Sequence, residues 1–341
     1  MHTISVKYAL LAALTVACGF GQATATIQTF PLQDTNGLIP TRNVKAEAVE
    51  YQGRRAVRLA YEGHEDGFAV LPGTDFQDGV IEAEIALKVT TPPGVRNPGF
   101  LGIAFRARPD ASHYELFYLR PGNAVAQDQA MRNHAVQYVA APDFGWYQLR
   151  RAWPWVYESH ADLKPETWTK VKIEVAGRMA KLYVNGSDSP ALVVDGLKGE
   201  DLRGVVALWG YANEEAYFSN VRITPAAPLN IKNGSDITGT WNLRYSSDAG
   251  VLEGSLKLNR DATKVSGTWS GALGQNCAVT GTWRDGYIEL SFPGEWPKDV
   301  GLGVPGPVTA CLAGWIDGNA GKGRMRVEAH SDGQWTATRK E

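Results

Sequence analysis

The sequence is dominated by short runs in which apolar and polar residues alternate, and such runs favour β-strands. Clusters of Gly, Pro, Asn and Asp separate these runs, which occupy residues 80–89, 100–107, 114–120, 171–175, 181–184, 205–209 and 217–223. Helical periodicity sustained over the length of an ordinary helix is hard to find after residue 25. The pattern therefore predicts an all-β protein, with a sandwich or a barrel in its first part.

The chain changes character after TPAAPLNIKNGSD, residues 224–236, which is rich in Pro, Ala, Asn and Gly and has the chemistry of a linker. A length of 341 residues is also enough for two ordinary domains. We therefore expect a first domain over residues 26–225, a linker over 226–236 and a second domain over 237–341.

The second domain repeats a motif in which Gly precedes Trp, directly or by one residue, at Trp241, Trp269, Trp283, Trp315 and Trp335. Eight candidate strands follow one another here, many joined by Asp-Gly turns that suit hairpins. A closed up-and-down barrel of about eight strands is the economical prediction, because closure removes exposed edges. The opening strand ITGTWNLRY resembles that of avidin-type barrels, and the whole domain resembles small lipocalin-like modules. The tryptophans are expected to fill a tapering interior, which needs no ligand.

The first 25 residues have the character of a cleavable secretory signal. Lys7 precedes an apolar run over residues 8–18, and Ala23-Thr24-Ala25 supplies a small-x-small cleavage site. Lipidation of Cys18 is the less favoured alternative, because no Leu stands three residues before it. We expect a periplasmic or secreted protein, in which Cys277 and Cys311 form one disulfide. The alternative is a pair of buried thiols.

The formal net charge is −2, which gives no electrostatic case for a nucleic acid or an anionic membrane as partner. No segment after the leader approaches the roughly 20 apolar residues of a membrane span. His, Cys and acidic residues show no zinc spacing and no calcium-binding loop. No cofactor is expected, although sandwiches of this kind admit a structural calcium ion.

Glu82 and Glu84 are the first candidates for chemistry, because alternate positions on a strand place them roughly 6–7 Å apart on one sheet face. Paired carboxylates near that separation serve glycoside hydrolysis. The Glu-x-Asp-x-x-Glu strand of laminarinase-type glucanases is nevertheless not reproduced, since the central Asp is a Glu and the third acid is missing. A solvated acidic strand face is therefore the preferred interpretation.

The stretch from Glu115 to Glu158 carries the strongest functional signal. Its first strand ends before Pro121, which has no N–H to donate to a sheet. A long polar and aromatic insertion without clear regular structure follows, and such segments are more often functional than idle. Together with Arg106 on the preceding strand, the residues expected to bind a ligand are Tyr118, Arg120, Asn133, Gln137, Tyr138, Trp146, Tyr147, Arg150 and Trp153. Amide and guanidinium donors among aromatic faces suit the hydroxyls and C–H faces of a sugar.

Four stretches carry a family resemblance: GFLGIAFRARPDASHYELFYLRP, ETWTKVKIEVAGRMAKLYVNG, GVVALW and YFSNVRI. They resemble the concanavalin A-like/laminin G-like sandwich, and within it the secreted bacterial domains described as 3-keto-disaccharide hydrolases. The resemblance covers about residues 28–225 and implies a jelly-roll sandwich with a carbohydrate ligand. It leaves open whether a bond is broken.

Three hypotheses about function follow. The preferred one is an exported carbohydrate-binding protein whose barrel is an accessory module. The alternative is a glycoside hydrolase or lyase that acts on a glycoside or a 3-keto-glycoside. In that enzyme Glu115 or Glu158 would be the general base, His134 the acid/base, and Arg120 or Arg150 the oxyanion stabiliser. The third is a structural or adhesive envelope protein.

Overall fold

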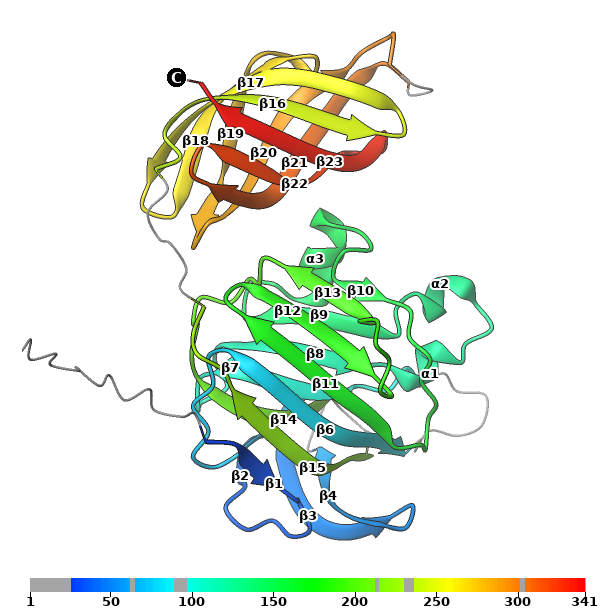
Figure 1. Cartoon of the computed structure of the whole chain (residues 1–341). Helices are drawn as coiled ribbons and strands as arrows, with labels where there is room; N and C mark the ends of the chain where they lie inside the picture. The colour runs from blue at the N-terminus through cyan, green and yellow to red at the C-terminus, as the bar shows by residue number, and fades with distance from the viewer. Residues whose placement is uncertain are drawn as a thin grey trace, which may run out of the picture.

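The structure is a computed structural model that describes residues 26–61, 65–88, 97–211, 215–229, 236–300 and 304–340. The proposed leader 1–25, with Cys18, lies outside the described residues, as does most of the expected linker. The protein is almost entirely β, as predicted: two sheets form a sandwich and eight further strands form a closed barrel (Figure 1). The last sandwich strand ends at Pro225 and the first barrel strand begins at Gly239.

The first sheet of the sandwich has eight antiparallel strands, in the order β13-β12-β11-β6-β15-β4-β3 with β1 paired to β15. Their bounds are β1 Gln28–Phe30, β3 Val44–Tyr51, β4 Arg54–Tyr61, β6 Gly79–Lys88, β11 Thr169–Ala176, β12 Met179–Val184, β13 Leu192–Asp195 and β15 Glu215–Pro225. Ile81, Ile85 and Leu87 of β6 are buried, whereas Glu82 and Glu84 lie on the outer face. Period-two alternation is thus converted directly into an inner and an outer face.

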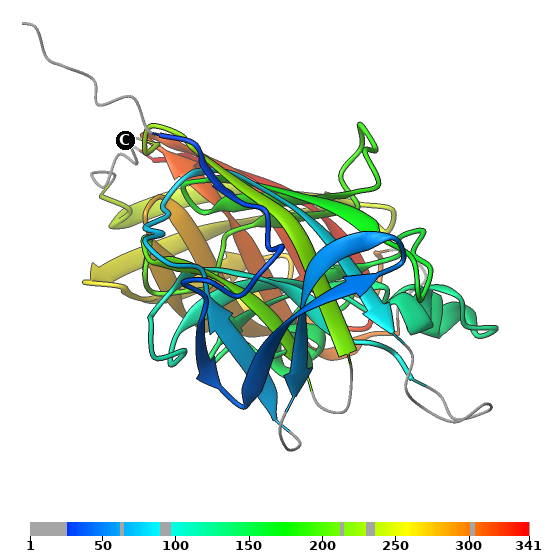
Figure 2. The same ribbon diagram turned by 90° about the horizontal axis from the view of Figure 1, so that it is seen from below.

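The second sheet has seven antiparallel strands, in the order β10-β9-β8-β7-β14-β5-β2. Their bounds are β2 Ile39–Arg42, β5 Asp66–Val70, β7 Leu101–Ala107, β8 Tyr114–Leu119, β9 Val136–Ala141, β10 Glu158–Ser159 and β14 Val205–Tyr211. The face toward the first sheet is identified by Tyr61 of β4, whose ring packs directly on Gly67 and Gly210. Phe105 and Phe117 lie on this same inner face. Seen from below, β3 and β4 lie at the near end of the molecule, away from the barrel (Figure 2).

All seven strands expected in the first domain are present, within one or two residues of their predicted ends. The expectation of an insertion without regular structure after Pro121 was wrong. This segment contains β9, which lies between β8 and the two-residue edge strand β10 of the second sheet, and three short helices: α1 Pro121–Ala124, α2 Gln129–Arg132 and α3 Trp146–Ala152. Pro121 stands at the start of α1, where a missing N–H costs nothing. β9 is the short run VQYVAA, and it follows so closely on the polar residues of α2 that the sequence pattern does not separate it from them.

The barrel contains eight antiparallel strands: β16 Gly239–Ser247, β17 Gly250–Asp261, β18 Lys264–Gly271, β19 Gly274–Arg284, β20 Tyr287–Trp296, β21 Gly306–Asp317, β22 Ala320–Val327 and β23 Ser331–Arg339. Trp241, Trp269, Trp283 and Trp335 are buried in its interior, as expected from the repeated motif. Trp315 differs, since its indole Nε1 donates to Asp195 of the sandwich.

The predicted disulfide is not formed, because Cys277 and Cys311 both carry free thiols. Cys277 is on β19 and Cys311 on β21, and β20 runs between these strands. Strands two apart in a sheet are separated by roughly 9–10 Å, whereas a disulfide needs Cα atoms within roughly 7 Å. Burial raises the pKa of the Cys311 thiol. Among the described residues, no helix is long and apolar enough to cross a membrane.

Candidate functional site

One row of register partners crosses the outer face of the second sheet. It runs Trp209, Gly102, Tyr118, Gln137, Glu158, contributed by β14, β7, β8, β9 and β10 in turn. Because Gly102 has no side chain, the rings of Tyr118 and Trp209 meet across it with centroids 5.2 Å apart. The row thus begins with aromatic rings and ends with an amide and a carboxylate.

Glu158 is the centre of a buried ionic cluster at the end of this row. Its Oε2 lies 2.8 Å from His134 Nδ1, 3.5 Å from Arg120 Nη2 and 2.5 Å from Arg150 Nη2. Arg150 Nε donates to the other oxygen at 2.7 Å, so the guanidinium holds the carboxylate in a fork. Only 2% of the Glu158 side chain is exposed. The residues that form this Glu158 cluster are Arg120, His134, Gln137, Arg150 and Glu158.

Gln137 connects the cluster to the backbone. Its Oε1 accepts from Arg120 Nη2 at 2.7 Å, while its Nε2 donates to the carbonyls of Tyr138 and Tyr157. Arg120 is itself buried, and this burial lowers its pKa. Burial also raises the pKa of the neighbouring Tyr118 to about 12, so its hydroxyl is neutral. The polar groups are therefore fixed in position before any ligand arrives.

His134 joins the cluster to the protein surface. Its imidazole lies parallel to the indole of Trp155, with 5.5 Å between the ring centroids and 4° between the planes. Burial lowers the pKa of His134, although the nearby Glu158 carboxylate acts in the opposite direction. The neutral imidazole is therefore favoured at neutral pH, and it supports Trp155 from beneath.

Three large aromatic side chains are exposed beside the cluster: Trp146 by 48%, Tyr147 by 58% and Trp155 by 60%. Trp146 and Tyr147 open helix α3, and their rings meet edge to face at 5.9 Å. The Arg150 guanidinium lies 4.9 Å from the centre of the Trp146 ring, one helical turn later. The same arginine thus contacts both Glu158 and an exposed ring. We call Trp146, Tyr147 and Trp155 the aromatic surface.

Several residues expected at the site lie elsewhere. Glu115 and Tyr138 point to the inner face of the second sheet, where the Tyr138 hydroxyl donates to the Glu115 carboxylate and Gly199 N donates to its other oxygen. Glu115 and His134 therefore do not share a cleft, and the hypothetical pair of Glu115 with His134 lacks its geometry. The physical reason is the alternation of β8, which sends Glu115 and Tyr118 to opposite faces.

Arg106 is also an internal structural residue. Its side chain is fully buried, forms an ion pair with Asp78 at 2.8 Å, and donates to the carbonyls of Gln77 and Gly177. Asn133 ends helix α2 and accepts from Gln129. Trp153 is 8% exposed and packs at the end of α3, toward the barrel.

Sequence reasoning did not select Trp155 or Trp209 as binding residues. Trp209 belongs to the stretch GVVALW, which carries the resemblance to the sandwich scaffold and so does not by itself indicate a binding residue. Trp155 follows Pro154 in the stretch 146–157, which holds five aromatic residues, and its exposure depends on the backbone conformation. It has φ of 67°, a left-handed conformation uncommon for a bulky residue. Only the folded chain shows this conformation.

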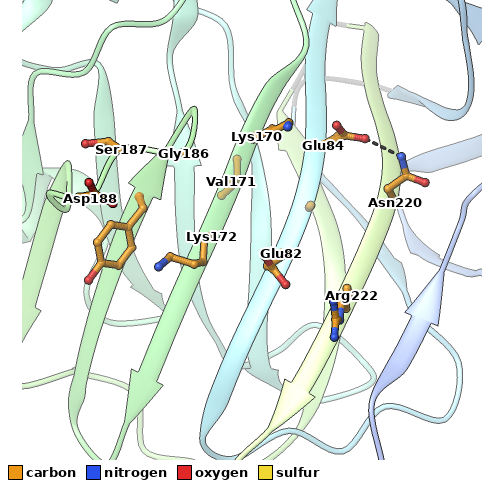
Figure 3. Close-up of a pocket in the computed structure, with 12 residues that line it drawn as sticks. Glu82, Glu84, Lys170, Val171, Lys172, Gly186, Ser187, Asp188, Asn220 and Arg222 are labelled. Atoms are coloured by element: carbon orange, nitrogen blue, oxygen red, sulfur yellow. Dashed lines mark hydrogen bonds between the residues drawn. The ribbon is translucent and has the colours of Figure 1, made fainter.

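Glu82 and Glu84 border a separate shallow hollow of about 490 Å³ on the outer face of the first sheet (Figure 3). Glu84 pairs with Arg54 at 2.5 Å and accepts from Asn220. Lys172 and Arg222 flank Glu82 as its cross-strand partners. Glu84 is thus paired with a cation and Glu82 has two cationic neighbours on a solvated face, as the preferred interpretation of the sequence expects. In the described part of the chain, no three His, Cys, Asp or Glu side chains gather closely enough to hold a metal ion.

No protein-family model matches the chain, and no curated protein matches it. Solved structures that it resembles include the carbohydrate-binding module CBM66 from Bacillus subtilis, with 14% identity over 55% of this chain and 95% of that chain and a TM-score of 0.39. Another is a GlcNAcα1-4Gal-releasing endo-β-galactosidase from Clostridium perfringens, with 11% identity over 94% of this chain and 98% of that chain and a TM-score of 0.36. The VIP36 exoplasmic/lumenal domain in its Ca²⁺-bound form has 8% identity over 54% of this chain and 83% of that chain and a TM-score of 0.39. Likenesses at this level leave function to be argued from the site itself.

Proposed function

We propose that the sandwich domain binds a carbohydrate on the aromatic surface beside the Glu158 cluster. The observation that carries this proposal is the support beneath Trp155, an indole that is 60% exposed yet held against His134, which in turn lies 2.8 Å from Glu158. A solvent-exposed ring fixed in this way offers a flat apolar face for the C–H groups of a sugar. Arg150, with 32% of its side chain exposed, supplies donors for hydroxyls.

Binding is favoured over catalysis by the state of Glu158. A general base needs a free lone pair within reach of the proton that it removes. Both oxygens of Glu158 are already engaged by Arg150, and Oε2 also faces Arg120 and His134. Such a carboxylate serves to orient its neighbours. The second candidate, a glycoside hydrolase or lyase, rests on the single observation that His134 and Glu158 form a close pair.

A combined screen tests these functions. The purified protein, exported as we propose, is titrated with neutral polysaccharides and with 3-keto-glycosides, and binding and product formation are followed together. Binding without turnover, weakened in Trp155→Ala and Trp146→Ala, supports the proposal. Tyr211→Ala is the matched control, because Tyr211 is 41% exposed but lies on β14, across the sheet from the cluster.

The remaining outcomes decide between the alternatives. Turnover that disappears in His134→Gln supports the enzyme. If the protein neither binds nor converts any compound of the panel, both the binding function and the enzyme function are contradicted. The structural or adhesive role then remains.

A further inference from the structure

We propose that the barrel supplies a second wall of the sugar site, so that an oligosaccharide held on Trp155 continues into a groove between the two domains. This inference rests on the proposed function and names its substrate class. The groove has a volume of about 390 Å³, which falls in the range of roughly 300–1,000 Å³ typical of small-ligand sites. Trp155 and Glu158 line it from the sandwich, and Tyr287, Arg324 and Gln334 line it from the barrel.

Trp155 and Glu158 belong to both the aromatic surface with its cluster and the groove. A ligand ring stacked on Trp155 therefore lies at the entrance of the groove, and further units of the same ligand have the barrel wall beside them. This continuity favours a chain of sugar units over a single one. Ala191 and Leu192 of the sandwich add apolar floor between the polar groups.

The barrel offers two donors that are not used by the fold. Arg324 on β22 and Gln334 on β23 are register partners, and both side chains are exposed. Within the described residues, neither side chain has a hydrogen bond or an ion pair with another part of the protein. Other arginines at the domain boundary are occupied, since Arg178 binds Asp285 at 2.6 Å and Arg326 donates to the carbonyl of Ala152 at 3.4 Å. A guanidinium beside an amide can bind neighbouring hydroxyls of a neutral sugar.

The two walls are held at a fixed separation by direct contacts between the domains. Lys198 of the sandwich forms an ion pair with Glu289 of the barrel, and Arg284 donates to the Lys198 carbonyl at 3.1 Å. Tyr287 packs against Gly196, where a Cβ atom would lie 2.1 Å from the ring. A groove preorganised in this way avoids the entropic cost of assembling its walls on binding.

Calorimetric titration of the full exported chain tests the inference. The probes are the monosaccharides, disaccharides and longer oligosaccharides of glucose, galactose and mannose. Removal of both unused donors in the double variant Arg324→Ala/Gln334→Ala is expected to weaken binding of the longer oligosaccharides about tenfold. Monosaccharide affinity is expected to stay at its wild-type value. The matched control is Lys322→Ala, which removes an exposed cation from the same face of β22 without touching the groove.

The two proposals fail in different ways. If the double variant binds long oligosaccharides as tightly as the wild type does while Trp155→Ala loses affinity, the barrel wall is refuted and the proposed function stands. If the wild type binds none of the probes, the proposed function fails and this inference fails with it. Because both side chains are exposed, an unchanged melting temperature is expected to show that the double variant is folded.

Discussion

The imidazole of His134 and the indole of Trp155 lie face to face, 4° from parallel, at the boundary between a buried ionic cluster and the solvent. Trp155 reaches this place through a left-handed backbone conformation, with φ of 67°. A non-glycine residue in this conformation costs free energy of folding, on the order of 1–2 kcal/mol. The protein thus holds a large exposed ring in a position that is unfavourable for stability.

Because of this cost, two substitutions of Trp155 are expected to have the same effect on sugar binding but different effects on the free energy of unfolding. Trp155→Gly and Trp155→Ala both remove the ring, and both are expected to lose sugar affinity. Glycine adopts a positive φ without strain, so Trp155→Gly should unfold at higher denaturant than Trp155→Ala, by about 1 kcal/mol in the free energy of unfolding. Urea denaturation of the two variants measures this difference. Equal stabilities would show that the backbone conformation stores no strain.

Loss of the Glu158 carboxylate is expected to lower the free energy of unfolding strongly, because this carboxylate is the centre of the buried cluster. In Glu158→Gln, Arg120 keeps its amide contact with Gln137 but loses its nearby negative charge, and the fork with Arg150 is broken. Removing one partner of a buried ion pair typically costs about 3–5 kcal/mol. We expect a loss of that order in the free energy of unfolding. Glu82→Gln, on the solvated face of the first sheet, is the control and should change it by less than about 0.5 kcal/mol.

Acid pH is expected to lower the free energy of unfolding, because His134 is protonated more readily in the unfolded chain. Burial lowers the pKa of His134 below its ordinary value of 6.5, so the folded state binds this proton less readily than the unfolded chain does. Stability is therefore expected to fall as the pH drops below about 6.5, until the folded-state pKa is passed. Glu158, Arg120 and Arg150 face this imidazole, and they are retained in the variant His134→Gln.

Urea titrations of the wild type and of His134→Gln from about pH 8 to about pH 5 measure this effect. The stability advantage of the wild type over the variant should shrink toward acid pH. The half-buried His330 is the same in both proteins, so its contribution cancels. A constant difference across this range contradicts the expected linkage.

The domain contact predicts a specific effect of one methyl group. Gly196→Ala places a Cβ atom 2.1 Å from the Tyr287 ring, so the ring or the barrel that carries it must shift away. We expect thermal unfolding, measured by calorimetry, to broaden or separate into two transitions as the domains lose their contact. Gly186→Ala is the matched control. Gly186 has a φ of 74°, close to the 84° of Gly196, but open space where the Cβ would lie. A similar unfolding profile for both variants would mean that Tyr287 yields without moving the barrel.

For the seven strands predicted in the first domain, the alternation of residues in sequence was sufficient to determine which side chains face inward, although β9 was missed. Ile81 and Ile85 turn inward while Glu82 turns outward, because successive side chains of a strand point to opposite sides. The same rule correctly separates Glu115 from Tyr118 on β8. The Gly-Trp motif likewise predicts the barrel, since a small closed sheet needs large side chains to fill its interior.

The tertiary structure alone decided which strands lie side by side. Trp209, Gly102, Tyr118, Gln137 and Glu158 form one row because of strand order and register, which depend on pairings between distant segments. The same pairings place β20 between the two cysteines and bring Tyr287 of the barrel against Gly196. Local alternation assigns each residue to a face of its own strand, whereas a site is made from neighbouring strands, and nonlocal packing selects those neighbours.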